Sequence, residues 1–169
     1  FERDVLPVAR AFWEAHLLGS YATELRGSLA GVLLRDVERE GWNARYQALT
    51  AQGDLVSLEE WFANQPPHLY AGAVHRLHNL AGPQTGDLLL ISNYAEGYYF
   101  AQPMRGMHGG LHPEDSCATL AFGLPGASQE TWQSTKGAFI TAVKRRCTEE
   151  DDRHPSTCDL LVGLWELLG

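Results

Sequence analysis

The sequence has few of the features that place a protein in a specialised class. It contains three cysteines, Cys117, Cys147 and Cys158, and no two of them form a CxxC pair. This count and spacing exclude a zinc finger and give no support to a disulfide framework, so we expect three ordinary thiols. No apolar run approaches the roughly 20 residues of a transmembrane helix, and no secretory signal peptide is visible.

Positive charge is also scarce. The 13 Lys and Arg residues stand against 21 Asp and Glu residues, which gives a formal net charge of -8. Proteins that bind the phosphate backbone of nucleic acids carry a basic face, so this balance argues against a nucleic-acid partner. It does not exclude a small phosphorylated substrate, because a metal ion can supply the positive charge locally.

The remaining composition is that of a globular domain. The 169 residues suffice for one core, and a hydrophobic content of 44% argues against disorder. The chain begins with Phe1 rather than Met and stops inside an apolar run. We therefore expect residues 1–169 to form a single, incomplete domain of a longer protein.

Apolar periodicity predicts helices near both ends of the chain. Residues 2–26 form the first, and the residues expected on its apolar side are Val5, Val8, Phe12 and Leu17. Residues 156–169 form the last, with an apolar stripe of Leu160, Leu161, Leu164, Leu167 and Leu168. Serines mark two further helix starts, because Ser57 and Ser128 precede the periodic segments 57–65 and 128–147.

Continuous apolar runs predict buried strands over 29–37, 87–92 and 117–126. Two shorter strands are expected around turns at Gly41 and Gly53. Uninterrupted apolar strands are typical of a sheet that helices cover on both faces. The fold class predicted from this mixture is α/β, as a layered α-β-α sandwich.

The segment RGMHGGLHPEDS, residues 105–116, carries the candidate metal ligands. Imidazole is a common zinc ligand, and the glycines beside His108 would let the backbone bend close to a metal. The competing interpretation is a loop histidine that forms local hydrogen bonds. His112 is a second candidate, although the glycines and Pro113 argue against a helix that would align it with His108.

Other polar residues favour structural interpretations. His75 and His78 have the HxxH spacing, but an exposed helical face explains them better than a metal site. Asp87 is expected to form a turn before a buried strand, and the acidic run 149–152 to be a solvated linker. The sequence contains no glycine-rich phosphate loop and no GxSxG motif.

Three segments in one order resemble the C-terminal part of the alkaline-phosphatase-like superfamily, nearest to the type I phosphodiesterases and nucleotide pyrophosphatases. They are GDLLL at 86–90, GMHGGLHPEDSCATLAFGLPG at 106–126 and STCDLLVGLWELLG at 156–169. The family pattern is a strand opening with GD, a GTHG-like loop, a PE turn and a closing helix. The likeness covers roughly residues 70–169; Met107 replaces the usual Thr, and Val162-Gly163 stands where the family has Pro-Thr.

The resemblance implies a metal-dependent phosphoric ester hydrolase with a phosphorylated small-molecule substrate. In such enzymes the histidine of the HG motif binds one of two zinc ions, and here that residue is His108. The zinc ions would bridge the phosphoryl oxygens and activate the attacking hydroxyl. Residues 1–65 contain no match to the family's nucleophile or other ligands. The isolated chain is therefore expected to be inactive without a missing N-terminal segment; relatives are often exported, and the compartment stays open.

Three alternatives remain. A sulfatase or a cofactor-independent phosphoglycerate mutase shares the HG motif, although the three cysteines lie in the wrong part of the chain for a sulfatase. A non-catalytic binding or assembly domain would use the aromatic residues of 94–100 for a carbohydrate or protein partner. The third alternative is an unrelated small α/β domain. Zinc affinity that depends on His108 separates the hydrolase from the binding domain.

Overall fold

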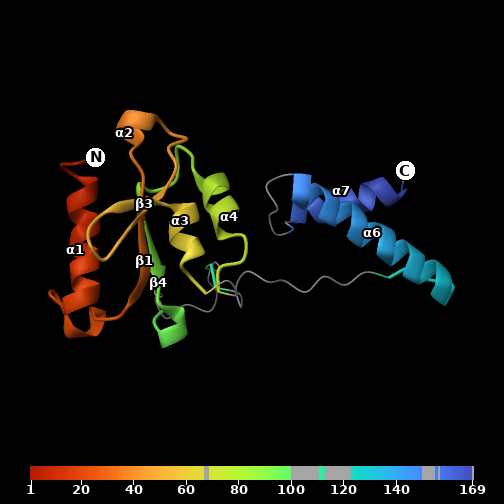
Figure 1. The fold of residues 1–169 in the computed structure, drawn as a ribbon, viewed down its shortest axis with the longest axis horizontal. Helices are drawn as coiled ribbons and strands as arrows, with labels where there is room; N and C mark the ends of the chain where they lie inside the picture. The colour runs from red at the N-terminus through yellow and green to blue at the C-terminus, as the bar shows by residue number, and fades with distance from the viewer. Residues whose placement is uncertain (67–68, 100–110, 113–122, 150–154, 156, 169) are drawn as a thin grey trace. The chain divides into compact units, whose positions relative to one another are not determined.

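The computed structural model describes residues 1–66, 69–99, 111–112, 123–149, 155 and 157–168 (Figure 1). The chain divides into two compact units, Phe1–Cys117 and Ala118–Gly169, and each is described by itself. The expectation that residues 1–169 form a single domain stays a prediction. In the predicted strand over 117–126, residues 117–122 lie outside the described residues, and the last residues form a turn at Pro125 and Gly126.

Unit 1 is built around a four-stranded antiparallel sheet, so the mixed α/β class is confirmed. The strand order is β3-β2-β1-β4. The strands are β1 (Leu29–Leu34), β2 (Gln47–Leu49), β3 (Leu55–Ser57) and β4 (Leu88–Ser92). In register, Leu33 of β1 stands between Ala48 of β2 and Leu89 of β4. The predicted strands at 29–37 and 87–92 and the predicted pair around Gly41 and Gly53 are therefore present, with shorter bounds.

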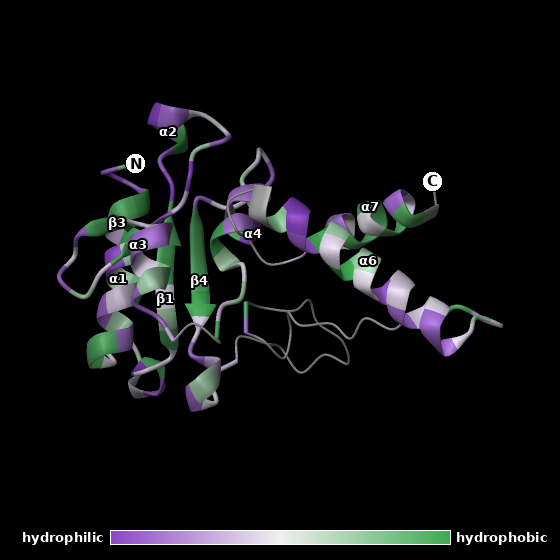
Figure 2. Ribbon diagram, turned by 45° about the vertical axis from the view of Figure 1, so that its right-hand side comes forward, coloured by the Kyte–Doolittle hydropathy of each residue, from purple (hydrophilic) through white to green (hydrophobic). Residues whose placement is uncertain are grey.

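Helices cover both faces of this sheet. The helices of unit 1 are α1 (Val5–Leu18), α2 (Val37–Glu40), α3 (Leu58–Ala63) and α4 (Ala73–Leu80), with 3-10 turns η1 (Thr23–Leu25) and η2 (Tyr94–Glu96). Figure 1 shows α1 on one side of β1 and β4, and α3 and α4 on the other. Val32 and Leu34 of β1 pack with α1, whereas Leu33 packs with α3 and α4 on the opposite face. Successive side chains of a strand point to opposite faces. This explains the uninterrupted apolar run of β4 (Figure 2), whose alternate residues join the two clusters.

The first helix differs from its prediction in length and in its buried face. It spans α1 rather than 2–26, because Gly19 adopts a left-handed conformation (φ 70°) and its N–H donates to the carbonyl of Ala15. The core side of α1 carries Leu6 and Ala9, with Trp13 packed beside them. The predicted apolar side was wrong: Val5 packs against the core, but Val8, Phe12 and Leu17 are exposed.

Local chemistry explains the start and the packing of α3. The hydroxyl of Ser57 accepts a hydrogen bond from the backbone N–H of Glu60 (3.1 Å), so the predicted helix cap is confirmed. Trp61 of α3 lies directly over Gly31 of β1. A Cβ atom at Gly31 would lie 2.8 Å from the ring carbon Cζ2 of Trp61, so only glycine lets the indole pack this closely on the strand.

Unit 2 consists, in its described residues, of two packed helices, α6 (Gln129–Glu149) and α7 (Thr157–Leu168). The predicted cap is confirmed, because the Ser128 hydroxyl accepts from the N–H of Thr131 (3.2 Å). The residues that pack between the helices are Phe139, Val143, Cys147, Leu160, Leu164 and Leu167. Leu161 of the predicted stripe is instead exposed. Within the described part of the chain, no helix is long and apolar enough to cross a bilayer.

Candidate functional site

A tight turn follows β4 and positions the residues nearest to the predicted metal site. The backbone N–H of Asn93 donates to the carbonyl of Ser28 (2.8 Å), and its side-chain amide donates to the carbonyl of Gly27 (2.9 Å). The short helical turn η2 then ends at Gly97, whose φ of 85° lies in the left-handed region that favours glycine. These contacts fasten the chain after β4 to the segment that precedes β1.

Three aromatic side chains meet beyond this turn, and we call Tyr94, Tyr99 and His112 the aromatic cluster. The ring centroid of Tyr94 lies 4.5 Å from that of His112 and 5.9 Å from that of Tyr99. The rings meet at interplanar angles of 46° and 68°, respectively, rather than in parallel. Tilted and edge-to-face contacts of this kind suit the charge distribution of aromatic rings.

Contacts of neighbouring residues attach the aromatic cluster to the rest of unit 1. The hydroxyl of Tyr98 donates to the carbonyl of Arg26 (2.8 Å), which fixes the residue directly before Tyr99. Leu111 packs against the core cluster beneath α3 and α4, which fixes the residue directly before His112. The cluster therefore brings the turn after β4 together with His112, which follows Tyr99 by 13 residues in the chain.

The structure describes one of the two predicted zinc ligands. His108 lies outside the described residues, and His112 belongs to the aromatic cluster. Among the residues that the structure describes, no group of three or more His, Cys, Asp or Glu side chains could hold a metal ion. A catalytic zinc ion needs about three protein ligands. The described residues alone therefore do not fit a zinc site, and both histidines stay predictions.

The HxxH pair on α4 makes contacts with its neighbours. Nε2 of His78 lies 3.7 Å from a carboxylate oxygen of Glu59 on α3, and Nε2 of His75 lies 2.8 Å from the amide nitrogen of Asn79. Both histidines are half-buried rather than fully exposed. The predicted exposed face is therefore wrong for both side chains, and among the described residues no group of three possible ligands includes this pair.

A buried arginine that the sequence analysis did not single out holds the start of β4. The side chain of Arg35 is completely buried and donates to the carbonyls of Trp42 and Gly82, both at 2.9 Å. It also donates to the carbonyl of Thr85, and its Nε lies 3.4 Å from a carboxylate oxygen of Asp87. Asp87 is thus a turn residue, as predicted, with an ion pair in addition. An arginine directly after the apolar run of β1 was the available signal.

The ring of Tyr46 packs against the guanidinium group of Arg35. The guanidinium carbon of Arg35 lies 5.4 Å from the centre of the Tyr46 ring, within the range of a cation–π contact. The Tyr46 hydroxyl donates to the carbonyl of Gly86, so it too fixes the turn before β4. Burial raises the pKa of Tyr46 above its ordinary value, and the hydroxyl stays protonated as a donor at neutral pH.

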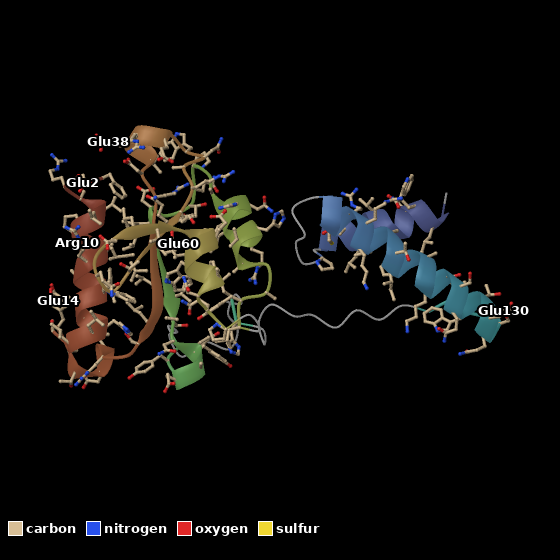
Figure 3. All side chains as sticks on the ribbon, in the orientation of Figure 1. Glu2, Arg10, Glu14, Glu38, Glu60 and Glu130 are labelled. Atoms are coloured by element: carbon tan, nitrogen blue, oxygen red, sulfur yellow. The ribbon has the colours of Figure 1, made fainter. Side chains whose placement is uncertain are left out.

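A separate open groove of about 460 Å³ lies between α1 and the turn that joins β2 to β3. Trp13, Leu17 and Leu49 supply its apolar lining. Arg10 and Glu14, labelled on the exposed side of α1 in Figure 3, contribute charge at its rim. None of its lining residues belongs to the aromatic cluster, so the groove is distinct from the candidate site.

Comparisons with known proteins return no relative. No family model matches the chain, and no curated protein or solved structure matches it either. The likeness to the alkaline-phosphatase-like superfamily therefore rests on the motifs in the sequence.

Proposed function

We propose that this chain is the C-terminal segment of a metal-dependent phosphoric ester hydrolase of the alkaline-phosphatase-like superfamily. The observation that carries the proposal is the order of the GD, HG and PE motifs and the closing leucine-rich helix along residues 86–169. The fold gives further support. Gly86 and Asp87 directly precede β4, as the motif requires, and the last motif forms α7.

The layered arrangement of the whole domain is part of the same proposal. We propose that unit 1 is part of a layered α-β-α sandwich, because α1 packs on one face of the sheet and α3 and α4 pack on the other. Arg35 donates to the carbonyl of Gly82 and pairs with Asp87, so it holds the turn directly before β4. The strand that leads to the HG segment is thus held firmly at its start.

The zinc ligand proposed in this chain is His108, with His112 as the second candidate. Zinc acts as a Lewis acid in phosphoryl transfer. The described residues do not fit a complete site, so we assign them no catalytic step. The nucleophile and the other ligands would come from residues elsewhere in the protein, and the 169-residue chain is expected to be inactive by itself.

Zinc titration tests the proposal. Isothermal titration of the longer protein that supplies the other ligands should show zinc binding that weakens about tenfold or more in His108→Ala, because even outer-shell partners of a metal are worth 10- to 100-fold. His75→Ala on α4 is the matched control and should leave the affinity unchanged. Equal affinity in the wild type and His108→Ala would contradict the assignment. Chelator-sensitive turnover of bis(p-nitrophenyl) phosphate by the 169-residue chain alone would contradict its predicted inactivity.

The second candidate is a non-catalytic binding or assembly domain, and α7 supplies the observation that favours it. Its two charged residues both pair with α6: Glu166 with Arg145 at 2.7 Å and Asp159 with Arg146 at 3.6 Å. Leu161 and Trp165 are 63% and 78% exposed. A helix that is apolar on both sides is usually buried. A binding domain should show no zinc affinity that depends on His108.

A further inference from the structure

Residues 26–29, which lead into β1, are bonded to two other parts of unit 1, and we call them the linking segment. On one side they meet His16 near the end of α1. The carbonyl of His16 accepts from a backbone N–H of the segment (2.9 Å), and its Nδ1 accepts from the N–H of Leu29 (3.1 Å). On the other side, carbonyls of the segment accept hydrogen bonds from Asn93 and Tyr98. The linking segment therefore connects the end of α1 with the turn after β4.

The backbone N–H of Leu29 depends on His16 for an acceptor. Leu29 and Ser92 form a pair that exchanges no hydrogen bond, because the bond beside them runs from the N–H of Asn93 to the carbonyl of Ser28. The N–H of Leu29 consequently points away from β4, and on the other edge of β1 the strand β2 pairs with the last two residues of β1. Because Leu29 is buried, its N–H would be costly to leave without the imidazole.

Only neutral His16 can make this bond. A neutral imidazole has one nitrogen that accepts a hydrogen bond, whereas an imidazolium donates from both nitrogens. Since Nδ1 accepts here, the proton of neutral His16 is on Nε2. The ring also stacks on Trp13, with 4.8 Å between the centroids and 28° between the planes, which helps to fix its orientation. Protonation of Nδ1 would set its N–H against the N–H of Leu29 and break the bond.

Charged and titratable groups on the surrounding elements do not keep His16 protonated. They are Arg10 and Glu14 of α1, Glu24 of η1, Arg26 of the linking segment and Tyr98 of the turn after β4, and β1 has none. Glu14 and Glu24 accept hydrogen bonds from nearby hydroxyl groups. Burial, rather than any of these charges, lowers the pKa of His16 below its ordinary value. The neutral form is thus the state near neutral pH, and acidification removes it.

We propose that the contact between His16 and Leu29 is a pH-sensitive switch, which holds the turn after β4 when His16 is neutral and loosens it when His16 is protonated. The carbonyls that accept from Asn93 belong to the two residues directly before Leu29, so the effect passes through adjacent residues of the chain. The same turn carries Tyr94 and Tyr99, so the aromatic cluster should loosen with it. The contact involves neither a metal ion nor a phosphate ester, and it is independent of the proposed hydrolase activity.

NMR of the ¹⁵N-labelled 169-residue chain tests the switch between about pH 7.5 and about pH 5, a range that spans the ordinary pKa of histidine. The ring nitrogens of His16 report its protonation. Hydrogen exchange at the backbone amides of Leu29 and Asn93, corrected for the intrinsic rate at each pH, reports the contacts. On acidification we expect the protection of both amides to fall roughly fivefold or more, with the midpoint of the His16 titration. Unchanged protection, or a fall at Leu29 that Asn93 does not share, would overturn the proposal.

His16→Asn is the informative variant, because an amide oxygen can accept from the N–H of Leu29 but does not titrate. Its protection should stay near the neutral-pH level across the whole range. His75→Asn is the matched control, because His75 is another half-buried histidine, which contacts Asn79 on α4; this variant should keep the wild-type response. If His16→Asn responds to pH as the wild type does, or if His75→Asn abolishes the response, another group is responsible and the proposal is wrong.

Discussion

Gly31 is a position where one added methyl group should clearly lower the stability of the fold. In Gly31→Ala the new Cβ would lie 2.8 Å from Cζ2 and 2.9 Å from Cη2 of Trp61, and 3.4 Å from Cδ1 of Ile91. Carbon atoms prefer separations of about 3.5–4.0 Å, so the indole or the strand must move by nearly 1 Å. Overpacking of this kind costs about 1–3 kcal/mol, against a gain of about 0.5–1 kcal/mol from replacing glycine inside a strand.

We therefore expect a net loss of about 1 kcal/mol, and no more than about 2.5 kcal/mol, in the free energy of unfolding of Gly31→Ala. Urea denaturation followed by tryptophan fluorescence measures it, and Gly137→Ala is the control because a Cβ there meets nothing within 4 Å. The decisive comparison is the double-mutant cycle with Trp61→Phe, whose smaller ring should make Gly31→Ala less costly. A Gly31→Ala protein as stable as the wild type, or a cost unchanged in the Trp61→Phe background, would refute the proposed clash.

Three further predictions follow from the same structure. Gly163→Ala places a Cβ 2.8 Å from Cγ2 of Val143. The cost of this overpacking should exceed the gain of about 1 kcal/mol in helix propensity, so thermal denaturation should show a lower Tm for Gly163→Ala than for the wild type. Gly137→Ala, where a Cβ meets nothing within 4 Å, should instead raise the Tm. Arg35→Met leaves three carbonyls without their donor and should lower the free energy of unfolding by about 3 kcal/mol or more in urea titrations. Asp87→Asn, at the half-exposed end of the ion pair, should lower it by less than about 1 kcal/mol. Burial lowers the pKa of His16 below its ordinary value, and its Nδ1 accepts from the N–H of Leu29. The unfolded chain therefore binds the proton more readily, so stability present above about pH 6.5 should fall as the pH drops below it, and the urea midpoint of His16→Gln should depend less on pH in that range.

Local signals predicted much of the fold. The caps at Ser57 and Ser128 depend on residues three positions away, so the sequence alone reveals them. The apolar runs of β1 and β4 are likewise contiguous, and both strands were predicted. The sequence did not reveal which side of α1 would be buried. Its apolar residues surround much of the helix, and the choice is made by the sheet that packs against Leu6 and Ala9.

Contacts between distant segments carry the rest of the candidate site. The aromatic content of residues 94–100 was visible, but its meeting with His112 depends on the turn at Gly97 and on the packing of Leu111. Periodicity contains no information about such a meeting.

Arg35 shows how a residue without a chemical role can decide where a site forms. It lies at the end of β1, and its guanidinium reaches the carbonyls of Gly82 and Thr85, about 50 residues later in the chain. A buried guanidinium without these acceptors would be strongly destabilising. The turn before β4 supplies these acceptors in the observed arrangement, so the contacts of Arg35 favour the observed register of β4 against β1. Because β4 leads directly into the aromatic cluster, Arg35→Met should shift the NMR signals of the Tyr94 and Tyr99 rings. Asp87→Asn should leave the same NMR signals unshifted.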